Sequence, residues 1–434
     1  MLETIVAPAT PYGESSIGVI RISGSKALEI VKLLTKAKVF KNRYAHYRKV
    51  YLDNDIIDDV IVTFYESPNT YTGEDLVEIS CHGSVIIVRT IVNELINLGC
   101  LMAEPGEFTK RAFLNGKLDL LQAESITSII KSKSDINLKN QQKILSGELS
   151  NKLLTIKQEL LNVLSHFEHH LDIDEFDEVL ELDNYLDSLS FIQKELKNLM
   201  DSFSMGKLYN DGLHVVICGK PNVGKSTLFN RMLNSDIAIT SSEPGTTRDI
   251  INAEININGI PIKLFDTAGI RDSDNKVEKI GIDKAKKLSK IADLKLNIYD
   301  KMINKDGDLK KNEINIINKC DELSEGRYKD KFLYCSAKNN VGIDLIFDII
   351  KEKLILSKST DGATFITSSR QHLNIKDAYH KIGVALENIT NNNISIEILS
   401  LELREALDSI DLILGKTTPD DIINNIFSHM CVGK

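Results

Sequence analysis

The stretch His214-Val-Val-Ile-Cys-Gly-Lys-Pro-Asn-Val-Gly-Lys-Ser-Thr-Leu-Phe-Asn-Arg-Met-Leu233 decides the fold of one domain. Its first five residues form an apolar run typical of a buried strand, and its last seven are typical of a helix. Between them lies Gly219–Ser226, the pattern GxxxxGK[ST] in the strand–loop–helix context of a phosphate-binding loop. The glycines let backbone N–H groups face phosphates, and the helix N-terminus adds partial positive charge. The stretch therefore predicts a nucleotide-binding α/β domain in which Lys225 reaches the outer phosphates and Ser226 ligates Mg²⁺.

Three further motifs follow in order, each after an apolar run. Asp266-Thr-Ala-Gly269 is typical of a second switch, in which the aspartate holds the Mg²⁺ shell through water and Gly269 turns its amide toward the γ-phosphate. Asn318-Lys-Cys-Asp321 supplies a carboxylate that accepts hydrogen bonds from the guanine N1–H and amine, a donor pair that adenine lacks. Ser336-Ala-Lys338 supplies backbone contact to the guanine oxygen. Together the motifs predict a GTP-binding domain that rejects ATP.

The residues around the predicted γ-phosphate site suggest how hydrolysis proceeds. Ile270 follows Gly269 where signalling GTPases generally place a water-orienting glutamine, and the sequence shows no obvious arginine finger. The side-chain oxygen of Asn222 can hold a monovalent cation beside the phosphates. The loop Ser241–Thr247 can close over that cation with its carbonyls, while Thr247 serves Mg²⁺ as the first-switch threonine. Glu278 is a candidate for orienting water, although spacing alone favours an exposed helical glutamate there.

The regions outside this domain have other periodicities. From Leu2 to Leu118, short β-like runs alternate with helical patches such as Ser84–Leu98, which indicates a small α+β domain. The predicted strands include Gly18–Ser23, Asp59–Phe64 and Asp75–Ser80. From Asp119 to Tyr209 proline is absent and apolar residues recur three and four apart, as in a helical bundle.

Strands alternate with helices from Gly212 to Leu356, and Ser368–Asn391 and Ile396–Leu414 are again helical in pattern. We predict a multidomain α+β and α/β protein with boundaries at 1–118, 119–211, 212–356 and 357–434. The second and fourth segments form one discontinuous helical domain, into which the α/β domain is inserted. Leu294–Asp300 alternates polar and apolar residues, which is unusual for a central parallel strand.

Composition limits the function classes. The 434 residues include 53 basic and 62 acidic ones, for a net charge of −9. A nucleic-acid partner would therefore need a local basic patch or help from another protein. There is no apolar run of membrane-spanning length and no signal-peptide pattern, and the six cysteines form no CxxC pair or zinc spacing. We expect a cytoplasmic protein without membrane contact, and we interpret the acidic stretch Asp172–Asp187 as a solvated face or loop.

The motifs resemble those of a known family. Pro221–Thr227 together with Pro244-Gly-Thr-Thr-Arg-Asp249 resembles the TrmE–Era-like GTPases. Four further stretches narrow the resemblance to the MnmE (TrmE) family of tRNA-modification GTPases. They are Gly18-Val-Ile-Arg-Ile-Ser-Gly24, Ser80-Cys-His-Gly83, the run Glu104-Pro-Gly-Glu-Phe-Thr-Lys-Arg-Ala-Phe-Leu-Asn-Gly-Lys-Leu-Asp119 and the terminal Cys431-Val-Gly-Lys434. The resemblance covers essentially the whole chain.

The resemblance implies an activity, partners and cofactors. Family members work as homodimers with an FAD-dependent MnmG/GidA-type protein, in a heterotetramer that adds a carboxymethylaminomethyl group to the wobble uridine of certain tRNAs. Their N-terminal domain resembles folate-dependent aminomethyltransferases, binds a tetrahydrofolate one-carbon carrier and mediates dimerisation. Their G domains approach each other when K⁺ and GTP are bound.

The resemblance also assigns residues. It places the K⁺ ligands at Asn222, Ser241, Glu243 and Thr246, gives Glu278 the water-orienting role, and places the folate contacts at Arg21, Glu78, Lys117 and Lys434. It puts Cys431 at the folate site, with a part in the chemistry as a hypothesis. The GTP-binding residues it implies are Asn222, Val223, Gly224, Lys225, Ser226, Thr227, Ser241, Ser242, Glu243, Pro244, Gly245, Thr246, Thr247, Asp266, Thr267, Ala268, Gly269, Asn318, Lys319, Asp321, Ser336, Ala337 and Lys338.

The residues by themselves leave alternatives open. Without the resemblance, Arg21 and Glu78 form an ordinary cross-strand ion pair, Lys117 a solvated turn residue and Cys431 a packed thiol. Glu243-Pro244 departs from the aliphatic and small residues usual in relatives, and the proline stiffens the cation loop. An Era-type ribosome-assembly GTPase would need an RNA-binding module after the G domain, which the sequence lacks. A GTP-controlled scaffold would differ from the family in not binding folate.

Overall fold

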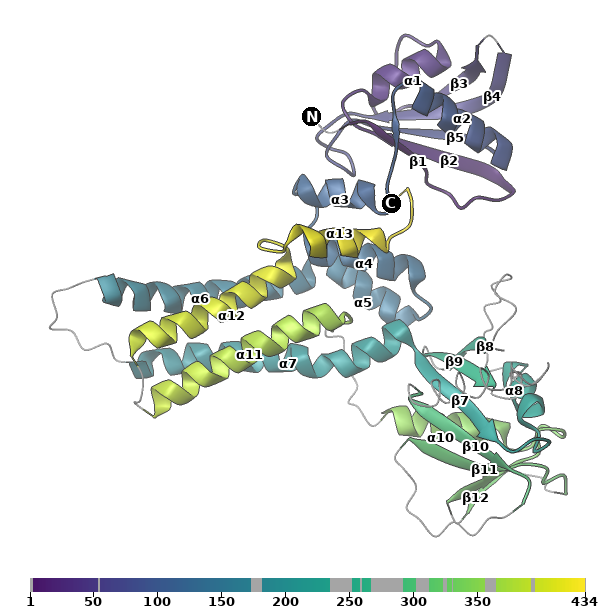
Figure 1. The fold of residues 1–434 in the computed structure, drawn as a ribbon, viewed down its shortest axis with the longest axis vertical. Helices are drawn as coiled ribbons and strands as arrows, with labels where there is room; N and C mark the ends of the chain where they lie inside the picture. Colours follow the sequence, from purple (N-terminus) through teal and green to yellow (C-terminus); the bar gives the residue numbers. More distant parts are fainter. Residues whose placement is uncertain are drawn as a thin grey trace, which may run out of the picture. The chain divides into compact units, whose positions relative to one another are not determined.

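The computed structural model describes residues 3–53, 55–172, 182–234, 252–257, 260–266, 292–301, 312–322, 326–329, 331–355, 364–391 and 395–433. The chain divides into two compact units. The first contains residues 1–130, 141–195 and 374–434, and the second contains residues 131–140 and 196–373. Most helices and strands of each unit are labelled in Figure 1. The mixed α+β and α/β architecture predicted from the sequence is confirmed.

The first unit begins with a six-stranded mixed sheet in the order β3-β4-β5-β2-β1-β6. Its strands are β1 (Ile5–Pro8), β2 (Ser15–Ser23), β3 (Ala45–Leu52), β4 (Asp55–Tyr65), β5 (Leu76–Gly83) and β6 (Leu101–Met102). Alternate residues of β2, such as Ile20 and Ile22, are buried in one core with residues of α1 (Ala27–Thr35) and α2 (Val85–Asn97). Residues such as Arg21 and Glu78 are partly exposed on the opposite face of the sheet. Of the predicted folate residues, Arg21 and Glu78 lie on this second face.

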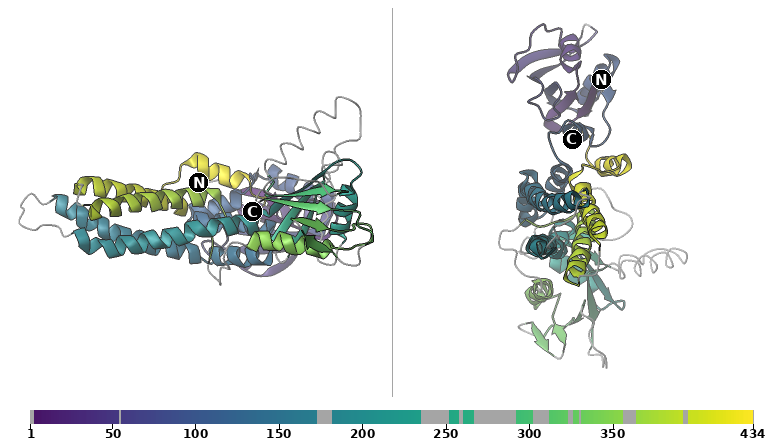
Figure 2. Two further views of the ribbon diagram at one scale, coloured as in Figure 1. Left: turned by 90° about the horizontal axis from the view of Figure 1, so that it is seen from below. Right: turned by 90° about the vertical axis from the view of Figure 1, so that its left-hand side faces the viewer.

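Helices make up the rest of the first unit and part of the second. They are α3 (Glu107–Leu114), α4 (Leu120–Lys131), α5 (Asp135–Leu145), α6 (Glu148–Asp172), α7 (Leu186–Asp211), α11 (Ser369–Thr390), α12 (Ile396–Leu414) and α13 (Asp420–Ser428). Helices α6 and α12 lie side by side (Figures 1 and 2). Most apolar residues predicted to recur along α6, such as Leu153 and Leu160, are buried, whereas Leu154 is 40% exposed. Lys157 of α6 donates to Asp411 of α12 at 2.6 Å from Oδ2, so an ion pair accompanies the apolar contact.

The second unit contains a seven-stranded sheet in the order β12-β13-β11-β10-β7-β9-β8. Its strands are β7 (Leu213–Gly219), β8 (Asn252–Ile257), β9 (Ile260–Asp266), β10 (Leu294–Tyr299), β11 (Glu313–Ile317), β12 (Arg327–Lys329) and β13 (Phe332–Tyr334). The five strands from β13 to β9 are parallel, and β8 and β12 run antiparallel at the edges. Helices α8 (Lys225–Leu233) and α10 (Ile343–Ile355) contribute to the same core. The carboxyl ends of the parallel strands therefore lie at one edge, where α/β proteins bind their ligands.

The unusual polarity of the predicted strand at Leu294–Asp300 has a structural reason. Strand β10 is central, and its residues alternate between buried and half-buried. The half-buried Asn297 lies beside Asn315 of β11 and donates to its Oδ1 atom at 3.2 Å. The polar side chains therefore pair with one another along one face of the sheet.

Within the part of the chain that the structure describes, no helix is long and apolar enough to cross a membrane.

We predict opposite effects for two helical glycines. A Cβ atom at Gly206 of α7 would lie 1.9 Å from the backbone oxygen of Ile366, whereas one at Gly383 of α11 would meet only the amide end of Gln193 at 2.9 Å. Gly206→Ala should lower the free energy of unfolding by about 1–3 kcal/mol, because backbone must move. Gly383→Ala should be neutral or stabilising by up to about 1 kcal/mol, because alanine is the better helix former. Thermal melting followed by circular dichroism measures both, and equal melting temperatures would contradict the packing of α7 against Ile366.

Candidate functional site

The loop after β7 has the backbone conformation of a phosphate cradle. Gly219, Asn222 and Gly224 have φ angles of 157°, 63° and 92°. Glycine and asparagine tolerate the left-handed region best, so the residue types suit the turn. Helix α8 starts at Lys225, directly after the loop, so its N-terminal amides face the same space. Lys225 is 6% exposed, and its Nζ atom donates to the carbonyl of Lys220 at 2.8 Å, which folds the lysine back along the loop.

A buried amide joins this loop to the two predicted base-binding motifs. Asn318 follows β11 and is 3% exposed. Its Nδ2 atom donates to the carbonyl of Val223 at 3.0 Å, and its Oδ1 atom accepts from the backbone N–H of Ala337 at 3.0 Å. A Cβ atom at Gly224 would lie 2.3 Å from this Nδ2 atom, so the loop requires glycine there. One side chain therefore connects the phosphate loop, the Asn318–Asp321 motif and the Ser336–Lys338 motif.

The candidate guanine-binding carboxylate is held in place by its neighbours. Ser336 donates its hydroxyl to Oδ1 of Asp321 at 2.5 Å, and Asn339 donates its side-chain amide to the Asp321 carbonyl at 3.1 Å. Arg231 of α8 donates to the carbonyls of Ala337 and Lys338 at 3.1 and 3.0 Å. A carboxylate with one oxygen engaged retains acceptor capacity for two ring donors of a base.

The structure brings together only part of the predicted GTP site. Asn222–Thr227, Asn318, Lys319, Asp321 and Ser336–Lys338 lie in the second unit around the carboxyl ends of β7, β11 and β13. Asp266 ends β9, whose register with β7 pairs it with Ile217, so its backbone lies at the same edge. The remaining predicted residues of this site fall outside the described residues: Ser241, Ser242, Glu243, Pro244, Gly245, Thr246, Thr247, Thr267, Ala268, Gly269 and Glu278. For Mg²⁺, the described chain offers the Ser226 hydroxyl, a hard oxygen donor of the kind this ion prefers.

In the first unit, Arg21 of β2 and Glu78 of β5 face each other across the ladder. Nε and one terminal nitrogen of Arg21 donate to Oε1 of Glu78 at 3.0 and 2.7 Å. The other terminal nitrogen donates to the carbonyl of Gly433 at 3.2 Å, and the guanidinium carbon lies 5.6 and 5.9 Å from the ring centres of Tyr71 and Phe108. The predicted cross-strand pair therefore exists, and it also binds the C-terminal segment.

Aromatic side chains lie beside this pair. Tyr71 shares a hydrogen bond with Thr109 at 2.8 Å, and burial raises the pKa of the Tyr71 hydroxyl despite the opposing effects of Thr109 and Arg21. Burial and the neighbouring Glu78 carboxylate raise the pKa of Tyr65. Lys117 is exposed and lies near Gly73: its Cε atom is 3.4 Å from the position that a Cβ atom on Gly73 would occupy. A cation, a carboxylate and aromatic rings are the groups that a pterin, with its guanine-like hydrogen-bonding edge, would need.

The C-terminal segment is tightly seated on the sheet. Gly433 has φ 87°, and a Cβ atom there would lie 2.1 Å from the carbonyl oxygen of Pro8. The backbone N–H of Gly106 donates to the carbonyl of Cys431 at 3.3 Å. Lys434 itself lies outside the described residues. This geometry explains why glycine occupies the third position of Cys431–Lys434.

Cys431 differs from the other thiols. All six cysteines are free, and Cys431 alone is exposed. Burial raises the pKa of Cys81 to about 11 and the pKa of Cys100 and Cys335 to about 12, so these three thiols stay protonated at neutral pH. Among the six, Cys431 is therefore the thiol most open to reaction.

Sequence reasoning missed a buried ion network beside this site. Arg111 of α3 is 4% exposed and donates to both Glu74 oxygens at 3.2 and 3.1 Å and to Oε1 of Glu107 at 2.7 Å. Glu74 also accepts from the Ser23 hydroxyl at 2.8 Å. The network fixes α3, with Phe108, against the loop that carries Tyr71. The i,i+4 spacing of Glu107 and Arg111 was a visible signal, but nothing in the sequence pointed to Glu74.

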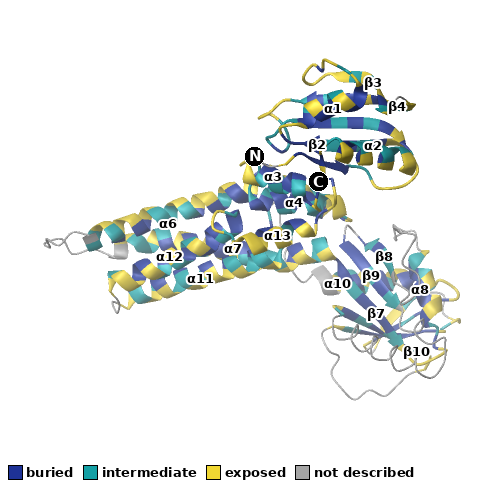
Figure 3. Cartoon of the chain, turned by 45° about the horizontal axis from the view of Figure 1, so that its top comes forward, coloured by how far each residue is buried: buried dark blue, intermediate teal, exposed yellow. Residues whose placement is uncertain are grey.

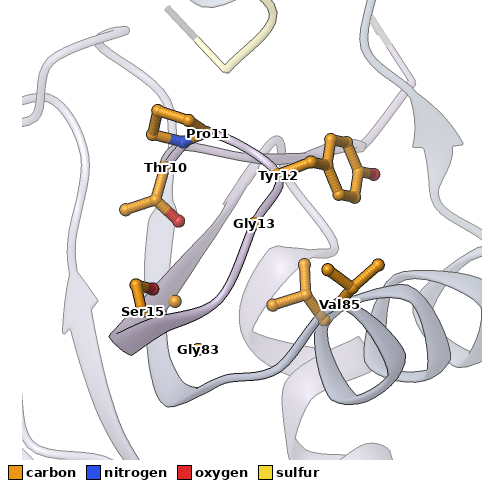
Figure 4. Close-up of a pocket in the computed structure, with 9 residues that line it drawn as sticks. Thr10, Pro11, Tyr12, Gly13, Ser15, Gly83 and Val85 are labelled. Atoms are coloured by element: carbon orange, nitrogen blue, oxygen red, sulfur yellow. The ribbon is translucent and has the colours of Figure 1, made fainter. Parts of the chain in front are cut away.

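A small pocket lies elsewhere in the N-terminal domain, lined by residues of the loop from Thr10 to Ser15 together with Gly18, Gly83, Val85 and Val88. Figure 4 shows the loop from Thr10 to Ser15 passing over Gly83 and Val85, where α2 begins. None of its lining residues is charged, and none is a predicted folate contact. The pocket therefore lacks the charged groups that a pterin site needs.

The chain matches two family models. One is described as the GTP-binding protein TrmE N-terminus and matches residues 4–117, and the other is described as the MnmE helical domain and matches residues 120–431. The tRNA modification GTPase MnmE of Carboxydothermus hydrogenoformans is 37% identical over 463 residues, with 100% of both chains covered. The protein of the same name from Aquifex aeolicus is 37% identical over 455 residues, again with 100% of both covered. A solved structure of Aquifex aeolicus Era bound to GDP and AlF₄⁻ is 23% identical and covers 39% of this chain and 66% of that one, with a TM-score of 0.25.

We predict that Asn318→Ala weakens GTP binding by about tenfold or more, because it leaves the Val223 carbonyl and the Ala337 N–H without their partner. Titration with a fluorescent GTP analogue measures the affinity. Asn315→Ala is the matched control: Asn315 is equally buried, at 3% exposed, but bonds to Asn297 and not to either loop. It should lower the melting temperature without a comparable loss of affinity. Equal affinity losses in both variants would show that Asn318 acts only through stability.

Proposed function

This chain belongs to the MnmE family of tRNA-modification GTPases and is a GTP hydrolase that acts in tRNA modification; from that premise we propose its finer chemistry. We propose that it is a K⁺-dependent GTPase that works with an FAD-dependent MnmG/GidA-type partner. Together the two proteins add a carboxymethylaminomethyl group to C5 of the wobble uridine of certain tRNAs, using a tetrahydrofolate one-carbon unit. The observation that carries the GTPase assignment is the buried Asn318 link between the phosphate loop and the base-binding motifs.

The chain's own residues divide the work of nucleotide binding. Loop amides from Asn222 to Thr227 hold the phosphates, and Lys225 neutralises their outer charge. Asp321, held by Ser336, accepts from the guanine ring, and Lys319 and Ala337–Lys338 complete the base site. Ser226 and Thr247 would hold Mg²⁺, with Asp266 in its water shell and Thr267–Gly269 at the γ-phosphate. The bound Mg²⁺ supplies charge stabilisation to the phosphoryl group that is transferred.

The K⁺ proposal depends on Asn222. At φ 63° the position favours glycine, asparagine or aspartate, and of these asparagine supplies a neutral side-chain oxygen beside the phosphates. Ser241, Glu243 and Thr246 are the other proposed ligands, within the loop that includes Ser242, Pro244 and Gly245. K⁺ would take the place of an arginine finger, and Glu278 would orient the attacking water.

The folate proposal places the pterin at Arg21, Glu78 and Lys117, with Lys434 at the end of the seated C-terminal segment. Tyr71 and Phe108 supply apolar surface beside Arg21. Cys431 is the accessible thiol of that segment, and its participation in one-carbon chemistry remains a hypothesis. We further propose a homodimer formed through the N-terminal domain, a heterotetramer with the MnmG-type partner, a cytoplasmic location, and domains at 1–118, 119–211, 212–356 and 357–434. A GTP-controlled scaffold that does not bind folate is the alternative.

The first test is single-turnover GTP hydrolysis in K⁺ and in Na⁺ at equal ionic strength. We expect K⁺ to accelerate hydrolysis at least about tenfold, since it supplies fixed positive charge in the transition state. Asn222→Gly should lose the acceleration, because glycine keeps the left-handed backbone accessible and removes the side chain that carries the oxygen.

Asn222→Asp, which keeps an oxygen donor, is the control for the K⁺ test and should retain part of the acceleration. Equal rates of the unaltered protein in both salts would leave the GTPase in place and discard the K⁺ mechanism.

We predict that Arg21→Ala weakens binding of 5-formyltetrahydrofolate by about tenfold or more, since a hydrogen bond to a charged group contributes about 1.5–3 kcal/mol. Isothermal titration calorimetry measures this affinity. Arg89→Ala, which removes an exposed arginine from α2, should leave it unchanged. Unaltered folate affinity in Arg21→Ala would restrict Arg21 to holding the Gly433 carbonyl, and no binding by the unaltered protein would favour the scaffold.

A further inference from the structure

One segment of this acidic protein is strongly basic. Between Lys32 and Tyr51 the chain has five lysines, two arginines and no acidic residue, whereas the whole chain has 53 basic and 62 acidic residues. Tyr44, His46, Tyr47 and Tyr51 lie within the same segment. Cations interleaved with aromatic rings are the pattern of a nucleic-acid-binding surface.

The segment lies on the border of the N-terminal sheet. It starts in the last turn of α1, continues through residues 36–44 and forms β3, which is an edge strand. Lys36, Lys38, Lys41, Arg43 and Lys49 are exposed. Figure 3 draws exposed residues in yellow, and yellow segments lie around β3. We refer to residues 36–49 as the basic edge.

Five cations of the basic edge have no carboxylate partner within the described chain. Lys38, Lys41, Arg43, Arg48 and Lys49 form no ion pair with its acidic side chains. Arg43 donates to the carbonyl of Asn69, and Arg48 donates to the carbonyls of Tyr47 and Val39 at 2.8 and 3.4 Å. Carbonyls are neutral acceptors, so these bonds orient the guanidinium groups and leave their positive charge in place.

Asp59 is the acidic residue nearest in register, since it pairs across the ladder with Lys49. A hydrogen bond to Asp59 raises the pKa of Tyr47, so this carboxylate is engaged by the tyrosine hydroxyl. The hydroxyl is a neutral donor, so Asp59 keeps its negative charge. It is one carboxylate beside five exposed cations, Lys36, Lys38, Lys41, Arg43 and Lys49, so the edge keeps a positive balance.

Two exposed rings accompany the cations. Tyr44 and Tyr47 are 55% and 61% exposed, which is high for large side chains. Lys41 Nζ lies 5.9 Å from the Tyr44 ring centre, and the His46 ring packs against the same tyrosine at 4.9 Å. These contacts hold Tyr44 beside the charge while leaving its ring partly open to solvent. Such a ring can stack on an unpaired base.

We propose that the basic edge binds tRNA, with Lys38, Lys41, Arg43 and Lys49 on backbone phosphates and Tyr44 against an unpaired base. The proposal rests on the tRNA-modifying function and adds a contact surface to it. A second copy of the same edge is excluded as the partner by charge, since its cations would repel those of the first. An acidic protein would satisfy the cations but gives no reason for exposed tyrosines.

The test is binding of labelled unfractionated tRNA to the full-length protein at several salt concentrations. Lys38→Glu/Lys41→Glu should weaken binding about tenfold or more near 0.1 M salt and reduce the slope of log affinity against log salt by about 2, since two phosphate contacts are lost. Lys194→Glu/Lys197→Glu on α7 changes net charge equally at two other exposed lysines and should leave affinity and slope unchanged.

Tyr44 separates stacking from charge. Tyr44→Ala should weaken tRNA binding on the order of tenfold without altering the salt slope, and Tyr44→Phe should restore it because the ring remains. Melting temperatures and intrinsic GTP hydrolysis should match the unaltered protein in every variant, because each substituted side chain is exposed and none belongs to the nucleotide-binding motifs.

Three results would overturn the proposal. The first is that Lys38→Glu/Lys41→Glu binds tRNA with unaltered affinity. If the unaltered protein binds and modifies tRNA, this result would refute the basic edge as the contact surface and leave the tRNA-modifying function in place. The second is an equal loss in the α7 control. The third is that polyglutamate displaces labelled tRNA as readily as unlabelled tRNA does when the two competitors are compared at equal charge. This result would assign the basic edge to an acidic protein partner. A protein that neither binds nor modifies tRNA would refute the function as well.

Discussion

The nucleotide-binding unit depends on the side chain of Asn318. A buried amide can satisfy a carbonyl and an N–H at once, and Asn318 does so for Val223 in the phosphate loop and for Ala337 in the base loop. Neither loop belongs to a regular element, so neither has a backbone ladder to fix its position. Because an unpaired buried polar group costs about 1–3 kcal/mol, moving either loop away from Asn318 is unfavourable. The amide thereby fixes the spacing between phosphates and base before any nucleotide arrives, which lowers the ordering cost of binding.

The N-terminal sheet uses the same principle with charged groups. Arg111 joins α3 to the Tyr71 loop through Glu74, and Arg21 joins β2, β5 and the C-terminal segment through Glu78 and Gly433. Each guanidinium has donors in several fixed directions, so one side chain can hold three segments. Removing one partner would leave a buried or half-buried charge uncompensated, which is more costly than losing an apolar contact. Both candidate sites are therefore built by polar side chains that connect segments distant in sequence.

The long sequence separation of these contacts explains which features could be predicted from the sequence and which could not. Periodicity predicted Ile396–Leu414, which are the bounds of α12, and the predicted strands Gly18–Ser23 and Asp59–Phe64 lie within β2 and β4. These patterns are local, so they are visible in a window of a few residues. Strand β10 looked too polar for the centre of a sheet, because its partner Asn315 becomes adjacent only after folding. The bonds from Asn318 to Val223 and from Arg111 to Glu74 span 95 and 37 residues and carry no periodic signal. Motif residues such as Asn318 could be named from the sequence, whereas the contacts by which Asn318 and Arg111 hold distant segments together could not.

The net charge of the chain is an average over all residues, and the charge of one segment can differ from it. A total of −9 argues against an exposed nucleic-acid-binding face only if the charges are evenly spread. At about 0.15 M ionic strength, interactions between exposed charges fade over roughly 8 Å, so a phosphate senses the groups within a few residues' reach and not the whole protein. The segment from Lys32 to Tyr51 excludes acidic residues entirely, and the acidic surplus lies elsewhere in the chain. An overall negative charge then limits non-specific binding of nucleic acid, while a short basic edge on a sheet keeps one place where a phosphate backbone is attracted.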